Sequence, residues 1–68
     1  MEKIKIKEDF IKLDSLLKFS GLAETGGHAK IIIQNGEVKV DGEVCIQRGK
    51  KVYKGSTVEF EEKGIIVE

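Results

Sequence analysis

Near the middle of the chain, a threonine and two glycines precede two side chains that can carry positive charge, His28 and Lys30. Thr25 is a suitable N-cap for a helix. Gly26 and Gly27 follow it, although glycine costs about 1 kcal/mol relative to alanine in a helix. The first turn of a helix presents unpaired N–H groups and the positive end of the dipole. Two glycines would leave that backbone open to a phosphate.

The two glycines have a second interpretation, in which they only permit a close approach between two helices. The sequence leaves both interpretations open. No Gly-Lys-Ser or Gly-Lys-Thr follows the glycines, so the run is not a P-loop and does not indicate nucleotide hydrolysis.

A second basic feature is the segment 48–51, Arg48-Gly49-Lys50-Lys51, which we call the basic loop. Arginine and lysine pair with phosphate, and a glycine lets a loop approach a nucleic-acid backbone. A solvated surface loop is the alternative. Together with the glycine-started helix, the basic loop could track successive phosphates on either side of one hairpin.

The formal net charge of the 68 residues is zero, but the charges are unevenly distributed. Residues 1–58 carry 11 Lys or Arg and 8 Asp or Glu, a net charge of +3, and residues 59–68 carry 1 and 4, a net charge of −3. The net charge therefore understates how basic one face can be.

The residue types offer little for catalysis. The chain has one histidine and one cysteine, and they would form a nucleophile and base only if His28 and Cys45 met in space. No ligands have the spacing of a zinc site. We expect no enzyme activity, no metal and no cofactor.

Length and composition predict one domain, residues 1–68, with a small core. The single cysteine suggests a reducing compartment. The chain has neither an 18-residue apolar run nor an apolar signal segment, so we expect a cytoplasmic protein that does not cross a membrane.

The apolar pattern predicts an α+β fold, with two packed helices against a small, mostly antiparallel sheet of short strands. We expect helices over residues 12–20 and 25–35, each followed by a glycine stop. Alternation predicts an edge strand over residues 3–7. The predicted hairpin has Asp41-Gly42 as its two-residue turn. Further strands are expected over residues 57–60 and 65–67, joined by a turn at residues 62–64.

We expect Val44 and Ile46 to face the core from the second arm of the hairpin, and Cys45 to face outward. Phe10 and Phe60 are predicted core residues. The few aromatic residues therefore do not suggest a platform for stacking bases. If nucleic acid binds, shape and phosphates should dominate, which suits structured RNA.

The chain resembles the S4 RNA-binding domain, and most closely the short stand-alone bacterial S4-like proteins of the YbcJ and YaaA type. The matching segments are KLDSLL (12–17), GLA (21–23), AKIII (29–33) and GEVKVDG (36–42). The resemblance implies an αL-type fold and RNA binding through the helix pair and the adjoining loops. Many S4 domains have a Ser-Arg pair where Thr25-Gly26-Gly27 stands here, so one arginine contact is absent.

The resemblance assigns RNA contacts to nine residues: Lys18, Thr25, Gly26, Gly27, His28, Lys30, Arg48, Lys50 and Lys51. The predicted function is recognition of structured RNA, with ribosomal RNA and tRNA as candidate targets. The alternative is an adaptor that docks on a ribosomal or RNA-processing protein. The exposed edge strand (3–7) and the acidic tail (59–68) motivate that alternative.

Overall fold

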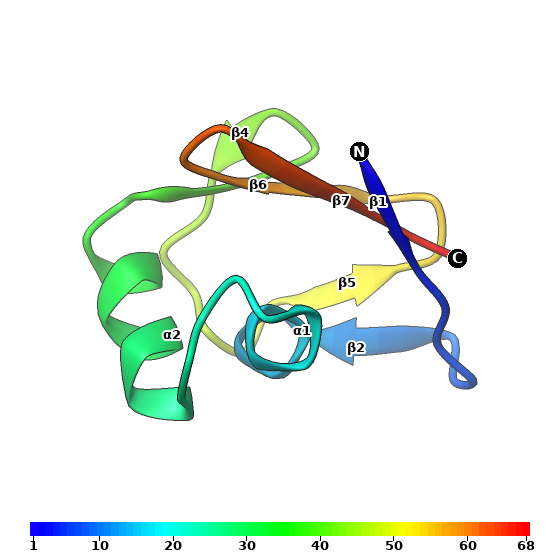
Figure 1. The fold of residues 1–68 in the computed structure, drawn as a ribbon, viewed down its shortest axis with the longest axis horizontal. Coiled ribbons are helices and arrows are strands. Elements are labelled where there is room, and N and C mark those ends of the chain that lie inside the picture. The colour runs from blue at the N-terminus through cyan, green and yellow to red at the C-terminus, as the bar shows by residue number, and fades with distance from the viewer.

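The computed structural model describes residues 1–68 as seven short strands and two helices (Figure 1). In chain order the elements are β1 (Glu2–Ile4), β2 (Phe10–Lys12), α1 (Leu13–Ser20), α2 (Gly26–Gln34), β3 (Val38–Val40), β4 (Glu43–Val44), β5 (Lys51–Tyr53), β6 (Thr57–Phe60) and β7 (Lys63–Val67). The predicted α+β class, with two packed helices and short strands, is confirmed.

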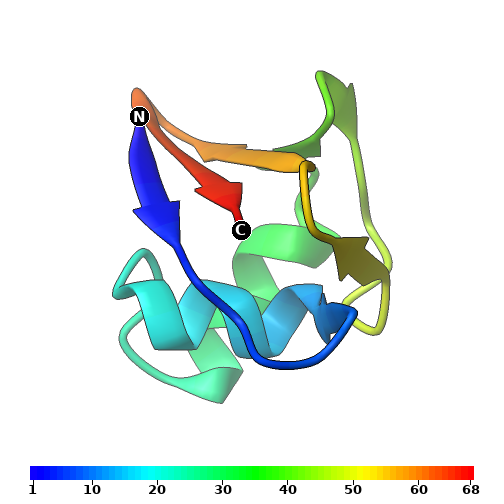
Figure 2. The ribbon, with the colours of Figure 1, turned by 90° about the vertical axis from the view of Figure 1, so that its right-hand side faces the viewer.

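Five strands form one sheet in the order β1-β7-β6-β3-β4, and β2 and β5 form a separate antiparallel ribbon. Within the sheet only β1 and β7 run parallel. Figure 1 looks down α1, which lies below the sheet with α2 on one side and the β2–β5 ribbon on the other. Figure 2 shows the same layers after a quarter turn.

The core between the layers contains 14 buried residues, all of them apolar. Leu13, Leu16 and Leu17 contribute from one face of α1, as their i, i+3, i+4 spacing predicts. The same spacing on α2 buries Ala29, Ile32 and Ile33. Neither helix is long or apolar enough to cross a membrane.

The helices begin and end close to the capping residues that the sequence predicts. Gly21 follows α1 with φ of 85° and donates its N–H to Lys18 O, a left-handed conformation that favours glycine. Thr25 caps α2, because its hydroxyl accepts the N–H of His28 at 3.0 Å. Gly36, with φ of 76°, follows the end of α2.

The Asp41-Gly42 turn is confirmed, but the predicted orientation of its second arm is wrong. Both turn residues have positive φ, and the two-residue loop places Val44 opposite Lys39. Directly opposed residues share a face of the sheet, so Val44 lies on the outer face with the exposed Lys39. Val44 and Ile46 are exposed, whereas Cys45 packs against the core.

Three further expectations need correction. The N-terminal strand ends at Ile4 instead of residue 7, although the half-buried Ile4 and Ile6 confirm the predicted alternation. The last turn lies at Glu61 and Glu62, and Gly64 is inside β7. Phe10 is half-buried in β2, a strand that the sequence did not predict, whereas Phe60 is in the core as expected.

Candidate nucleic-acid interface

The first turn of α2 leaves two backbone N–H groups free. Thr25 accepts the His28 N–H, while the N–H groups of Gly26 and Gly27 have no partner within the chain. A Cβ atom added at Gly26 would meet nothing within 4 Å, and one at Gly27 would meet only the Thr25 hydroxyl, at 3.8 Å. The glycines therefore do not relieve a tight contact between helices, and that interpretation is wrong. Their backbone faces solvent without any side chain to shield it.

His28 lies in the same turn, and its ring is tied to the fold. Its Nδ1 accepts the Glu24 N–H at 3.2 Å, so this nitrogen acts as an acceptor. The ring lies edge-on to Phe60, with centroids 6.5 Å apart. The hydrogen bond from Glu24 occupies Nδ1 and leaves Nε2 as the other ring nitrogen that could contact a ligand. Lys30, one residue after the buried Ala29, is exposed on the outer side of α2.

The basic loop forms part of the N-terminal cap of α1. The carbonyl oxygen of Lys50 accepts the Leu13 N–H at 2.8 Å, and that of Arg48 accepts the Asp14 N–H at 3.0 Å. These bonds satisfy two N–H groups that a helix start leaves unpaired, and Lys12, the N-cap residue, supplies no side-chain bond. The loop backbone is thus fixed, while its Arg48 and Lys50 side chains are exposed.

The two predicted phosphate sites lie on different parts of the helix pair. The basic loop is bound to the start of α1, and the first turn of α2 follows the connection that leaves the end of α1 (Figure 2). The eight residues of α1 span about 12 Å. Lys18 is exposed in the last turn of α1, at the end from which the chain leads on to α2.

The residues considered for catalysis have separate partners. The Cys45 thiol donates to the carbonyl oxygen of Gln47 at 3.7 Å, and His28 accepts from Glu24. No group of three or more His, Cys, Asp or Glu residues is placed to hold a metal ion. The Cys45 thiol and the His28 ring therefore do not form the hydrogen-bonded pair that a nucleophile and its base require.

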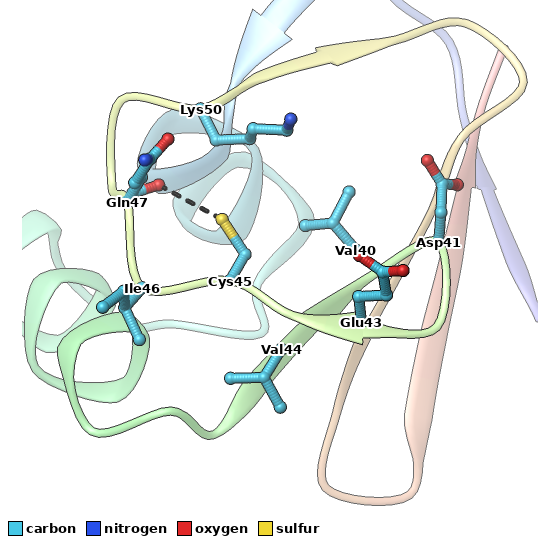
Figure 3. A pocket seen from close by; sticks show the side chains of 8 residues that line it. All are labelled: Val40, Asp41, Glu43, Val44, Cys45, Ile46, Gln47 and Lys50. Atoms are coloured by element: carbon cyan, nitrogen blue, oxygen red, sulfur yellow. Dashed lines mark hydrogen bonds between the residues drawn. The ribbon is translucent and has the colours of Figure 1, made fainter.

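A hollow of about 460 Å³ lies beside β4, and Figure 3 shows its lining. Asp41 and Glu43 contribute carboxylates to it and Lys50 an ammonium group. The Asp41 carboxylate already accepts hydrogen bonds from the Thr57 N–H at 2.9 Å and the Ser56 hydroxyl at 3.2 Å. With two acids against one base, the hollow does not favour a phosphate.

Sequence reasoning missed the outer face of the β2–β5 ribbon. Phe10 is paired with Tyr53, and Lys12 is paired with Lys51. The Lys51 Nζ lies 4.9 Å from the centroid of the Phe10 ring. This surface depends on a pairing between segments far apart in the chain, so the sequence singled out only one of its members as a candidate RNA contact: Lys51, as part of the basic loop.

Comparison with known proteins shows which protein family this chain belongs to. The family model of the S4 domain matches residues 4–68, and the chain belongs to this family. The chain is 44% identical over 54 residues to the putative RNA-binding protein YbcJ of Escherichia coli strain K12, covering 79% of this chain and 77% of the relative. It is 38% identical over 58 residues to the probable ribosome maturation protein RlbA of Bacillus subtilis strain 168, covering 85% and 82%.

A solved structure supports the same assignment. The solution structure of E. coli YbcJ, described as revealing an αL motif involved in RNA binding, matches with a TM-score of 0.75 and 38% identity. The match covers 98% of this chain and 86% of that one. These relatives are named for RNA binding or ribosome maturation, so the comparisons do not favour the adaptor alternative.

Proposed function

We propose that the protein binds structured RNA and holds its phosphates at two places, the first turn of α2 and the basic loop. Membership in the S4 domain family and the similarity to YbcJ support this function. The residues that the resemblance assigned to RNA are the proposed contacts. We also propose that the protein acts in the cytoplasm and that it binds RNA without catalysing a reaction.

The observation that carries the proposal is the openness of Gly26 and Gly27. Neither glycine has a positive φ, and neither would bring a Cβ into a clash. Helix propensity disfavours them, so the fold gives no reason for glycine at either position. Direct contact between their free N–H groups and an RNA phosphate does give one.

The ribosome is the proposed setting, because the similar B. subtilis protein is named as a probable ribosome maturation protein. Ribosomal RNA is accordingly the first candidate target, and tRNA the second. A ribosomal or RNA-processing protein could share the complex, with the RNA contacts made by this chain.

The test is the salt dependence of binding to a fluorescently labelled ribosomal RNA hairpin, measured by anisotropy between about 50 and 300 mM KCl. If about four phosphates are engaged, log Kobs should fall against log salt with a slope of about −3. A neutral polymer of similar size serves as the negative control. Absence of binding, or a flat salt dependence, would contradict the proposal.

A further inference from the structure

The outer face of the β2–β5 ribbon combines two aromatic rings and two lysines. The register pairs Phe10 with Tyr53 and Lys12 with Lys51. Because side chains alternate along a strand and opposed residues share a face, all four lie on the same side. The residues between them, Ile11 and Val52, pack toward the core. The ribbon therefore presents its non-core face as an aromatic and cationic surface.

Tyr53 is the accessible ring of this surface. Its exposed fraction is 50%, whereas Phe10 is half-buried behind it. The ring centroids are 5.7 Å apart and the ring planes are tilted by 50°, a geometry in which aromatic pairs attract. Phe10 thus supports Tyr53 in a fixed position while leaving part of the tyrosine ring open to solvent.

The two lysines lack acidic partners. Directly opposed like charges disfavour a strand pair, and the only ion pair in the chain joins Lys3 and Glu68. Lys51 Nζ lies over the Phe10 ring, which holds the ammonium group beside the aromatic pair. An anion placed between Lys12 and Lys51 would relieve their repulsion.

This surface is continuous with the proposed phosphate site. Lys51 is both the last residue of the basic loop and the first of β5. Lys12 directly precedes Leu13, whose N–H is bound by the loop carbonyl of Lys50. A polyanion on the basic loop therefore lies next to the lysine pair, and the exposed Tyr53 ring is two residues further along β5.

The apolar surface continues beyond Phe10. Phe10 lines a groove of about 320 Å³ together with Phe19, whose exposed fraction is 67%. The charged residues of this groove are Lys5, Lys7 and Glu8, so cationic side chains outnumber acidic ones. The groove could therefore hold a polymer chain that extends from the outer face of the β2–β5 ribbon.

We propose that the outer face of the β2–β5 ribbon binds an unpaired nucleotide of the RNA, with the base stacked on Tyr53 and the adjacent phosphates held by Lys12 and Lys51. This inference rests on the proposed RNA-binding function and specifies its target. An unpaired base exposes its π-face, whereas a base within a duplex does not. The preferred RNA is a hairpin or duplex with unpaired residues in a loop, bulge or end.

The experiment uses the fluorescence of Tyr53, which is the only tyrosine in a chain without tryptophan. The wild-type chain is titrated with a hairpin carrying an unpaired adenine loop, and with a blunt RNA duplex of equal phosphate number. Stacking predicts strong quenching by the loop hairpin and little by the duplex, together with tighter binding of the hairpin. An oligoglutamate of matched charge serves as the control for an acidic peptide and should not quench.

Two variants separate stacking from general packing. Tyr53→Leu keeps apolar bulk but removes the π-face, and should lower affinity for the loop hairpin about 5- to 100-fold while leaving duplex affinity unchanged. Tyr53→Phe keeps the ring and should bind within about twofold of wild type. Circular dichroism and thermal unfolding verify that both variants fold.

Each of the other possible results contradicts either the stacking subsite alone or the proposed RNA-binding function as well. If Tyr53→Leu binds the loop hairpin like wild type, or the duplex or oligoglutamate quenches Tyr53 equally, the stacking subsite is wrong and RNA binding stands. If the wild-type chain binds neither RNA, the proposed function fails as well.

Discussion

The backbone N–H of Asp14 donates a hydrogen bond to the carbonyl oxygen of Arg48 at 3.0 Å, across 34 positions of the chain. This bond, with the one from Leu13 to Lys50, makes the basic loop a part of the start of α1. The loop therefore does not need to order its backbone on binding, which lowers the entropic cost of the contact. Its positive side chains are presented by a fixed support.

Reversing the charge of the basic loop should weaken RNA binding without unfolding the protein. The Arg48→Glu and Lys50→Glu double variant removes two exposed cations, so the anisotropy assay should show at least a tenfold loss for all structured RNAs alike. The salt slope should become shallower by about 1.5 to 2. Lys63→Glu, in the acidic C-terminal region, is the matched control and should change affinity little. Loss for a single RNA sequence only would indicate base readout at the loop instead.

Substitution of the α2 glycines should separate stability from binding. In Gly26→Ala the added Cβ meets nothing in the chain, and the better helix propensity of alanine should stabilise the fold by up to about 1 kcal/mol. The same Cβ stands beside the free N–H groups, so RNA affinity should fall several-fold. Urea unfolding and anisotropy measure the two effects. Gln34→Ala, at the other end of α2, should leave affinity unchanged, and unchanged affinity in Gly26→Ala would remove the glycines from the site.

Asp41 should contribute to stability through both its backbone and its carboxylate. Its φ of 52° disfavours most side chains, and its oxygens accept from Thr57 and Ser56. Asp41→Ala should therefore cost about 1–3 kcal/mol in the free energy of unfolding, measured with urea. Asp41→Asn tolerates the same φ and keeps one oxygen acceptor, so it should lose less. An alanine variant as stable as wild type would show that the turn does not depend on this residue.

Leu17 should be among the most sensitive core positions. Its side chain is fully buried, and its carbonyl oxygen accepts the Ala23 N–H at 3.0 Å. Leu17→Ala should cost about 2–5 kcal/mol, a large part of the stability expected for a small domain. Thermal unfolding followed by circular dichroism measures the loss. Leu22→Ala, at a half-buried position, is the comparison and should cost less.

Signals confined to a few neighbouring residues predicted much of the fold. Each of these signals depends only on residues a few positions apart: the Thr25 cap, the stops at Gly21 and Gly36, and the Asp41-Gly42 turn. The outward position of Val44 was also within reach, because a two-residue turn after Val40 already requires it. These features need no knowledge of distant partners.

Features that depend on distant pairing were not predicted. β2 has only three residues, too few for a clear alternating pattern, and its partner β5 begins 39 residues after β2 ends. The pairing of Phe10 with Tyr53 follows from that ribbon alone. The sequence suggested no aromatic platform for the same reason. Likewise, the attachment of the basic loop to α1 arises from two backbone hydrogen bonds that no residue type reveals.

The parallel pairing of β1 with β7 joins Glu2 to Ile65, and the Ile6 N–H is bound by the carbonyl oxygen of Glu68. A ribosome synthesises the first of these segments long before the second. The N-terminal residues must therefore wait, unpaired, until nearly the whole described sequence has left the exit tunnel. Their lysines, Lys3 and Lys5, discourage pairing with other chains during this interval. Because β1 remains an edge strand of the finished sheet, the same exposed charges keep this role after folding.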